Sequence, residues 1–455
     1  MKEYTEGNMN ISERFVDFIS GKAEMLNTEE LVRESKLCIL DYLGCALAGG
    51  SILEGSIDKL LTELGGIGNT PIIGKQTGCD PMSAALLNAM SAHAVELDDG
   101  HRYGMLHPGA PVISALISAA SAGIVQNGQA FIKGVIIGYE VTCRLAQAIQ
   151  PGHKLKGYHG TGTCGNIGAA MAIGIAAGFS RQQLLSTISA ASTSASGLLE
   201  MIDDSSQLKP YNVGQAAMNG YLASCIGASG LQGPKDPLGG NRGFFKALAD
   251  EVNEDKLLTE EATFKIQQRY TKAYASCRHC HPAVEAALKL TNTFELDADE
   301  IERINVNTYK LAIQGHDLQK ADSISAAKMS TPFAVAAAIV KRKAGLEAFT
   351  DETIRDDRIK KISSKVIIAE DKDLTALSPG KRAAIVEFHL KDGRILNRRV
   401  DYPLGEPENP MSEEGLKDKY LSLGRYSGRS DDELLNLMSV TEKLNDNLKE
   451  WLDLL

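Results

Sequence analysis

The most informative stretch of the chain is His93-Ala-Val-Glu-Leu-Asp-Asp-Gly-His-Arg-Tyr-Gly-Met-Leu-His107-Pro-Gly-Ala-Pro111. Histidines, carboxylates and an arginine stand together here, a density typical of functional sites. Upstream, Asp80 and Pro81 are typical of the N-cap and first turn of a helix. Downstream, the small apolar residues 112–121 begin another helix. The sequence therefore predicts a charged turn between two apolar helices, where catalytic side chains often lie. An exposed polar loop is the alternative.

The composition is that of a globular protein too long for a single core. The 455 residues favour two domains. A net charge of -10 argues against nucleic acid as a partner. The longest apolar runs are shorter than the roughly 20 residues of a membrane span, and residues 1–7 lack the apolar segment of a signal peptide. The scattered cysteines favour free thiols. We therefore expect a cytoplasmic protein without a membrane partner.

Helical patterns fill most of the chain. The expected helices in its first part include 27–48, 165–178, 181–194 and 213–229, with a polar, glycine-rich loop at 149–163. Helical periodicity returns over 412–453. We therefore predict a mainly α fold, with a large all-helical domain built from both chain ends, 1–266 and 404–455.

Between these segments the pattern changes to that of an α+β unit. Residues 301–309 and 384–391 alternate as half-buried strands do. The pair Asp392-Gly393 is a strong turn signal, which would join 386–390 to 395–400 as a hairpin. Helices are expected at 282–292 and 325–341. The sequence thus predicts a smaller inserted α+β lid domain over 267–403.

A second cluster is Lys154-Leu-Lys-Gly-Tyr158-His159-Gly-Thr-Gly-Thr-Cys-Gly165. Its glycines match the dinucleotide-binding pattern, but no strand precedes them and no acidic residue follows before Glu200. We instead expect a loop that opens a helix, with free backbone N–H groups suited to a carboxylate. A tight packing turn is the alternative.

Two more clusters carry cations. Lys209 precedes a helix of small residues, where it would pair with an anionic substrate unless it simply faces water. In Lys272-Ala-Tyr-Ala-Ser-Cys-Arg-His-Cys-His281, Cys277, Cys280 and His281 spell the haem-attachment motif, but no export signal accompanies it. A zinc site would need four ligands, and no second pair is suitably spaced. We favour Arg278 and His281 as substrate groups, with helix capping as the alternative.

A divalent metal on the first stretch is a competing idea. The possible ligands are His93, Glu96, His101 and His107. Neither the HExxH pattern nor an octahedral carboxylate spacing is present, so we expect no metal.

These four clusters, with Ser325-Ala-Ala-Lys-Met-Ser-Thr-Pro-Phe-Ala, resemble the MmgE/PrpD family, in the same order and over nearly the whole chain. The resemblance implies a helical domain with an α+β lid, a homodimer and no cofactor. Family members include 2-methylcitrate dehydratase, cis-aconitate decarboxylase and iminodisuccinate epimerase, which act next to a carboxylate of a small di- or tricarboxylate. The resemblance places in one site Glu96, His107, His159, Lys209, Lys272 and His281.

Three positions depart from the decarboxylase-like pattern. Glu96 stands where those members carry Asp, Phe333 where they have Tyr, and Gly100 where a hydroxyl residue is common. These departures weaken the decarboxylase interpretation.

The implied chemistry needs a base and several cations, because removing a proton next to a carboxylate builds up negative charge on oxygen. The predicted catalytic residues are His107, His159, Lys209 and His281. The predicted substrate-binding residues are Glu96, Tyr158, Lys272 and Arg278, with Glu96 also orienting a histidine. We expect a dehydratase first. Epimerisation and decarboxylation would use the same residues, and a carboxylate-binding protein without activity is a further alternative.

Overall fold

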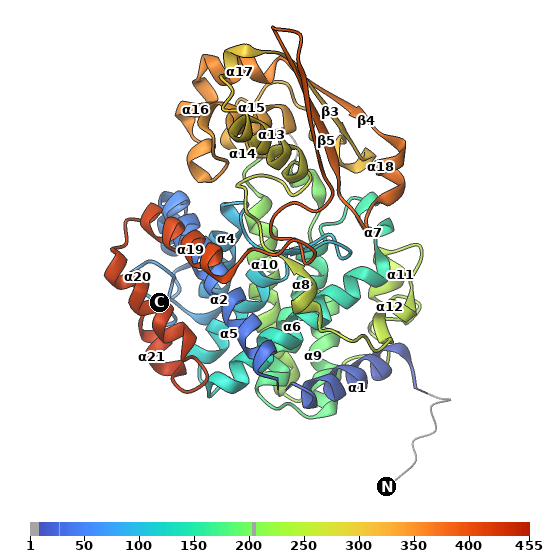
Figure 1. Ribbon diagram of the computed structural model, residues 1–455. Helices are drawn as coiled ribbons and strands as arrows, with labels where there is room; N and C mark the ends of the chain where they lie inside the picture. The colour runs from blue at the N-terminus through green and yellow to red at the C-terminus, as the bar shows by residue number, and fades with distance from the viewer. Residues whose placement is uncertain (1–8, 27, 203–205) are drawn as a thin grey trace.

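A computed structural model describes residues 9–26, 28–202 and 206–455 (Figure 1). Residues 1–7, on which we based the lack of a signal peptide, and Asn27, expected to open a helix, lie outside the described residues. The described chain is mainly helical, with an α+β part in the upper half of Figure 1. The predicted mainly α class with an α+β part is therefore confirmed, and the division into a helical domain and an inserted lid domain stays a prediction. The boundaries at 266 and 404, the homodimer and the cytoplasmic location stay predictions.

Helices from both ends of the chain form the lower half of Figure 1. They are α1 (Ile11–Glu24), α2 (Glu29–Ile52), α3 (Glu54–Leu64), α4 (Pro81–Ala94), α5 (Gly109–Ser121), α6 (Gly128–Ile149), α7 (Gly152–Leu155), α8 (Gly160–Ala176), α9 (Arg181–Thr193), α10 (Lys209–Ala228), α11 (Phe244–Leu248), α12 (Glu254–Leu258), α19 (Glu413–Tyr426), α20 (Asp431–Glu442) and α21 (Leu448–Asp453). Their buried faces share one apolar core. Trp451, fully buried near the C-terminus, packs edge-on against Phe131 of α6 with ring centroids 5.2 Å apart. The last helices are thus part of the first core.

The upper half is built on a four-stranded sheet in the order β4-β3-β5-β6. Its elements are α13 (His281–Thr293), β3 (Ile301–Thr308), α14 (Ile324–Met329), α15 (Thr331–Lys341), α16 (Asp351–Arg355), α17 (Asp357–Ser363), β4 (Val366–Glu370), α18 (Lys372–Leu377), β5 (Ala384–Leu390) and β6 (Ile395–Val400). Val306, Val386 and Phe388 are buried in a second core that includes side chains of α13 and α15. This core covers one face of the sheet.

The predicted hairpin is confirmed. β5 and β6 pair antiparallel with Phe388 opposite Leu396, and Gly393 takes the positive φ that the turn requires. The parallel strand β4 was not predicted, because Val366–Glu370 is a short edge strand without alternating burial. The helix expected at 325–341 is two helices, since Ser330 ends α14 and its hydroxyl accepts from the Phe333 N–H at 3.0 Å.

The predicted bounds of the glycine-rich loop, 149–163, are wrong. Residues 152–155 form α7, and α8 begins at Gly160 rather than near 165. The glycines instead let helices approach each other. A Cβ at Gly168 would lie 1.7 Å from the Thr142 hydroxyl oxygen. Within the cluster, Gly162 and Gly165 are closely packed in the same way, whereas a Cβ at Gly160 would meet nothing closer than 3.4 Å. A role of this helix start in binding a carboxylate therefore stays a prediction.

Helix α2 likewise continues past Gly49, where we expected it to end, and stops at Ile52. Gly49 lies against the backbone of α4, and a Cβ there would lie 1.8 Å from the Ser91 carbonyl oxygen. Taken singly, no described helix has the length and apolar character to span a membrane; the sharply bent pair α2 and α3 has both only when the two are counted together.

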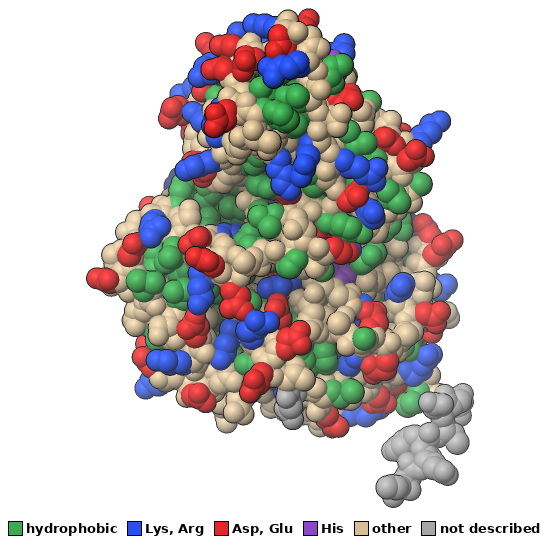
Figure 2. Space-filling model, viewed as in Figure 1, with side chains coloured by type: hydrophobic (Ala, Val, Ile, Leu, Met, Phe, Trp, Pro, Cys, Tyr) green, Lys and Arg blue, Asp and Glu red, His purple; other side chains and the backbone are tan. Residues whose placement is uncertain are grey.

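Acidic and basic side chains are interspersed on the face shown in Figure 2. Exposed opposite charges pair with each other, as in Arg33 with Glu413 at 2.6 Å. Such exposed pairs contribute at most about 1 kcal/mol each. The two apolar cores, rather than surface ion pairs, therefore hold the fold together.

The packing of α2 on α4 can be tested with Gly49→Ala. Because its Cβ would overlap a backbone oxygen, we expect the free energy of unfolding to fall by about 1–3 kcal/mol. Gly21→Ala in α1 is the matched control. Nothing lies within 4 Å of its Cβ, so stability should stay equal or rise by about 0.5–1 kcal/mol. Urea unfolding followed by circular dichroism measures both, and equal midpoints for the two variants would contradict the packing.

Candidate active site

The charged stretch forms the connection between α4 and α5, and a short strand pair fixes its position. β1 (Gly100–His101) pairs antiparallel with β2 (Arg269–Tyr270), with Gly100 opposite Tyr270. A Cβ at Gly100 would lie 2.3 Å from the Tyr270 hydroxyl oxygen, so this close approach requires glycine. The pairing brings the 269–272 segment beside the loop.

Asp99 ties the loop to two helices. Its carboxylate accepts hydrogen bonds from the Gly109 N–H at 3.2 Å and from the Tyr139 hydroxyl at 2.5 Å. Burial raises the pKa of Asp99 to about 7, although the Tyr139 hydrogen bond acts in the opposite direction. Asp99 therefore anchors the loop on α5 and α6 rather than facing the cavity.

Glu96 holds two lysines. Its carboxylate pairs with Lys209, the first residue of α10, and accepts from the Lys272 ammonium at 3.0 Å. Burial alone would raise the pKa of Glu96, but the two ammonium groups hold it well below its usual range. Lys272 also donates to the Glu96 carbonyl oxygen at 3.1 Å. These bonds hold Glu96 at φ +56°, a conformation that costs a non-glycine residue about 1–3 kcal/mol.

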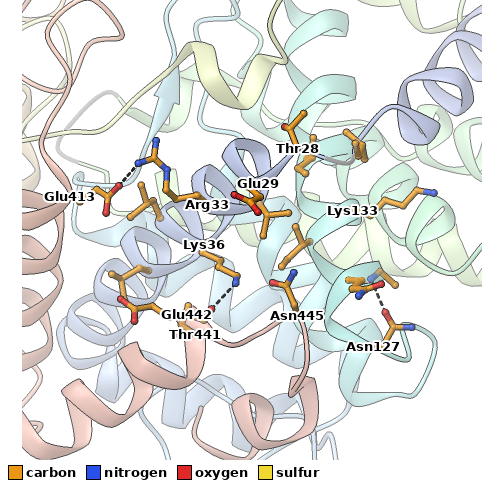
Figure 3. A pocket seen from close by; sticks show the side chains of 18 of the residues that line it. Thr28, Glu29, Arg33, Lys36, Asn127, Lys133, Glu413, Thr441, Glu442 and Asn445 are labelled. Atoms are coloured by element: carbon orange, nitrogen blue, oxygen red, sulfur yellow. Dashed lines mark hydrogen bonds and ion pairs between the residues drawn. The ribbon is translucent and has the colours of Figure 1, made fainter.

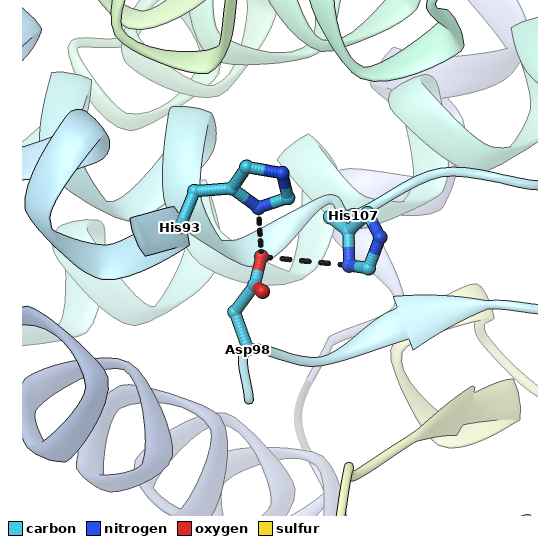
Figure 4. Close-up of side chains that lie close together, drawn as sticks. All are labelled: His93, Asp98 and His107. Atoms are coloured by element: carbon cyan, nitrogen blue, oxygen red, sulfur yellow. Dashed lines mark hydrogen bonds and ion pairs between the residues drawn. The ribbon is translucent and has the colours of Figure 1, made fainter. Parts of the chain in front are cut away.

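The carboxylate that faces histidines is Asp98, not Glu96 as predicted (Figure 4). The Nδ1 atoms of His93 and His107 lie 2.7 and 3.4 Å from the same Asp98 oxygen. Burial alone would raise the pKa of Asp98, but these histidines hold it below its usual range. Sequence reasoning assigned no role to Asp98 and considered His93 only as a metal ligand, because the neighbouring Glu96 matched the family motif.

His107 presents a free nitrogen. Its Nδ1 lies 2.6 Å from the Asp99 carbonyl oxygen, which only accepts hydrogen bonds. Nδ1 is therefore assigned the proton, and Nε2 keeps its lone pair. Burial lowers the pKa of His107 to about 3, against the attraction of Asp98, and the ammonium of Lys272 adds to the effect. His107 is thus a neutral imidazole near neutral pH.

Both predicted histidines of the first two clusters meet here. The ring of His159 lies 6.2 Å from that of His93. It stands at the N-cap position of α8, and its Nδ1 atom has no partner among the described residues. Burial, and then the neighbouring His93 and Lys209, lower the pKa of His159 well below its usual range.

A cavity of about 100 Å³ opens beside these groups. The predicted residues that line it are Glu96, His107, Tyr158, His159, Lys209, Lys272 and Arg278. His281 does not line it. The His281 ring is fully buried against Tyr274, with Nε2 donating to the Ser276 carbonyl oxygen at 3.2 Å. Its catalytic role stays a prediction.

The opposite wall comes from residues 277–279, 316 and 382. Arg278 pairs with buried Glu406 at 2.5 Å, and Glu406 also accepts from Arg102 of the charged loop at 3.1 Å. Cys277 Sγ lies 3.7 Å from His316 Nε2. Burial would raise the pKa of Cys277, but His316 lowers it to about 6. Neither the thiol–imidazole pair nor Glu406 was predicted from the sequence.

A larger, open hollow of about 1080 Å³ lies between α2, α6, α19 and α20 (Figure 3). Several of its charged side chains are paired with each other, as Arg33 is with Glu413, or with the backbone, as Lys36 is with the Glu442 carbonyl oxygen at 2.6 Å. No described histidine or cysteine lines it. The smaller cavity is therefore the candidate active site.

Among the described residues, His93, Asp98 and His107 offer atoms within 4.8 Å of one another, close enough for a metal ion. The donor chemistry does not favour one. The Nδ1 atom of His107 that faces Asp98 carries a proton, and that of His93 bonds the same carboxylate oxygen. These groups form a hydrogen-bond network instead.

The fold and the buried cluster of imidazoles, carboxylates and lysines define an enzyme. Models of the MmgE/PrpD N-terminal domain and the MmgE/PrpD C-terminal domain match residues 13–255 and 274–443. The chain therefore belongs to the MmgE/PrpD family, as the sequence motifs predicted.

Three relatives resemble nearly the whole chain. The cis-aconitate decarboxylase-like protein oryM of Aspergillus oryzae is 24% identical over 87% of this chain and 86% of its own length. The cis-aconitate decarboxylase of Mus musculus is 24% identical, covering 96% of this chain and 91% of the relative. That of Homo sapiens is 23% identical, covering 96% and 92%.

The cavity thiol gives a test of this geometry. Because His316 lowers the pKa of Cys277 to about 6, Cys277 should be a thiolate at neutral pH. We expect iodoacetamide to label it first, at a rate reaching half its maximum near pH 6. Cys225, also half-buried but on α10 outside the cavity, is the control. Mass spectrometry of timed samples measures both, and slower labelling of Cys277 at pH 7 would contradict the pairing.

Proposed function

We propose that this chain is a cofactor-independent lyase that removes a proton from a carbon next to a carboxylate of a small di- or tricarboxylate and then expels hydroxide. The observation that carries the proposal is the unprotonated Nε2 of His107, at a cavity lined by lysine and arginine side chains. Such a reaction is a dehydration of the 2-methylcitrate dehydratase type.

His107 is suited to act as the base. A general base must be unprotonated before the reaction and must lie within reach of the proton. Burial and nearby cations keep its imidazole neutral, while Asp98 at 3.4 Å would stabilise the imidazolium formed when it accepts the proton. A decarboxylase needs no initial proton abstraction, so a neutral base favours dehydration.

The cations are suited to stabilise the intermediate. Proton removal leaves an enediolate-like dianion, whose oxygens need fixed positive charge. Lys209 and Lys272 stand together on Glu96, and Arg278 lines the opposite wall. Glu96 thus positions two ammonium groups toward one place in the cavity.

The leaving hydroxide needs a proton to depart as water. His159 is better placed than His281 to contact the leaving oxygen, because it lines the cavity and His281 does not. Burial keeps His159 neutral, so we assign to it only a hydrogen bond to the leaving oxygen. The proton that makes water comes from the imidazolium that His107 forms when it takes the proton from carbon. The electron pair of the broken C–H bond forms the double bond as the C–O bond breaks, so charge and atoms balance.

Decarboxylation is the second candidate, because relatives that share about 90% of their length with this chain are cis-aconitate decarboxylases. Gly100 argues against decarboxylation, because the decarboxylase-like members commonly have a hydroxyl residue at this position. Here Tyr270 occupies the space that such a side chain would need. Epimerisation would follow if the proton returned to the opposite face.

The base can be tested with His107→Ala. We expect turnover and hydrogen exchange at the reacting carbon to fall about 100-fold or more. Proton NMR in heavy water with 2-methylcitrate, citrate, cis-aconitate and substituted succinates reports the substrate and the bond broken. His389→Ala on β5, outside the cavity, is the matched control. Full activity of His107→Ala would contradict the role assigned to His107. Loss of activity on chelation, with recovery when a metal is added back, would contradict a mechanism without a metal.

The pH dependence follows from the pKa of His107. A base works above its pKa, and that of His107 is lowered from 6.5 to about 3. We therefore expect kcat/KM, corrected for substrate ionisation, to stay level as the pH falls through 6.5. Steady-state rates between pH 5 and pH 8 measure this. An acid limb centred at 6.5 would show a histidine exposed to water instead.

A further inference from the structure

Two cations of the cavity have no part in the cluster around Glu96. Lys154 lies on α7 in the helical half, and Arg382 lies just before β5 in the α+β half. Both line the cavity. Within residues 9–26, 28–202 and 206–455, no carboxylate lies within ion-pair distance of either one. Lys209 and Lys272, in contrast, share the carboxylate of Glu96.

Their surroundings fix both groups in place. The Arg382 side chain is 5% exposed, and its guanidinium donates to the Arg102 carbonyl oxygen at 2.7 Å. The Lys154 ammonium lies 3.4 Å from His279 Nε2, while His279 Nδ1 lies 2.6 Å from the Tyr309 hydroxyl. A lysine ammonium only donates, so this Nε2 accepts and His279 is neutral.

The electrostatics of this corner call for an anion. Burial, and then the charges of Lys154 and Arg382, hold the pKa of His279 well below its usual range. Burial also lowers the pKa of Lys154; the nearby Cys277 thiol acts in the opposite direction, and Arg382 adds to the lowering. Buried cations are stable when a hydrogen-bonded anion accompanies them. The Cys277 thiolate offsets one positive charge of this corner, and no described carboxylate offsets the other.

We propose that Lys154 and Arg382 form a second carboxylate subsite, separate from the lysine pair on Glu96, that selects tricarboxylates over dicarboxylates. The inference rests on the proposed function, because it names the substrate class of the same cavity. The two carboxylates that a dicarboxylate also has would face the Lys209–Lys272 pair and Arg278. The third carboxylate, which only a tricarboxylate has, would bind between Lys154 and Arg382. Neither Lys154 nor Arg382 was predicted as a site residue from the sequence.

The test is a binding measurement that needs no turnover. Propane-1,2,3-tricarboxylate has no hydroxyl group to lose, and pentanedioate has the same carbon chain without the central carboxylate. Calorimetric titration above neutral pH compares their affinities. We expect the native chain to bind the tricarboxylate about tenfold more tightly, the size of one charge-assisted hydrogen bond. Lys154→Met should abolish that preference by weakening only the tricarboxylate.

Lys156→Met is the matched control. Lys156 ends the same helix, but it pairs with Asp250 at 2.6 Å and does not line the cavity, so the preference should remain. Arg382→Gln is the second variant, with its fold checked by circular dichroism because Arg382 also bonds Arg102. It should abolish the preference as well.

The outcomes separate this inference from the proposed function. An unchanged preference in Lys154→Met and folded Arg382→Gln, or an equal loss for both ligands, would overturn the subsite alone. If the native chain binds neither probe, the proposed function as an enzyme of small carboxylates is contradicted, and the subsite with it. Loss of the preference in Lys154→Met with retention in Lys156→Met supports the subsite.

Discussion

The site depends on one short backbone pairing, that of Gly100 with Tyr270. It places the loop from α4 to α5 beside residues 269–272, so that Lys272 reaches both the carbonyl and the carboxylate of Glu96. Without this pairing, the buried Lys272 ammonium would lose its hydrogen-bond partners on Glu96. Glu96 would in turn lose the bonds that hold it at a positive φ. Leaving a charge buried without a partner costs about 3–5 kcal/mol. Glycine is needed at position 100 because any side chain would displace Tyr270.

Burial in a cationic cavity sets the protonation of the histidines. His107, His159 and His279 all have lowered pKa values, because the charged imidazolium would stand in a poorly solvated place near ammonium and guanidinium groups. An anionic substrate would offset part of that positive potential. The imidazoles would then become more basic when substrate carboxylates are bound, which is when a base is needed. Free enzyme and complex would thus differ in proton affinity without any movement of the chain.

Local signals were the predictable part of the fold. Asp80 caps α4, Asp392-Gly393 turns the β5–β6 hairpin, and lysines in family motifs line the cavity, each because a short stretch carries the information. Tertiary contacts decided the rest. The glycines near residue 165 predict a loop when only the sequence is considered. In the structure they are helical, and a neighbouring helix lies too close to leave room for a Cβ. Lys154 and Arg382 stand 228 residues apart in sequence (382 − 154), and no local pattern reveals that they face one cavity.

Buried Glu406 links the two walls of the cavity. It bonds Arg102 on the histidine-bearing loop and Arg278 on the far wall. A movement of one wall away from the other would either break one of these buried ion pairs or move the loop between α4 and α5 with it. The position of one wall is thus mechanically coupled to that of the other through a single buried carboxylate.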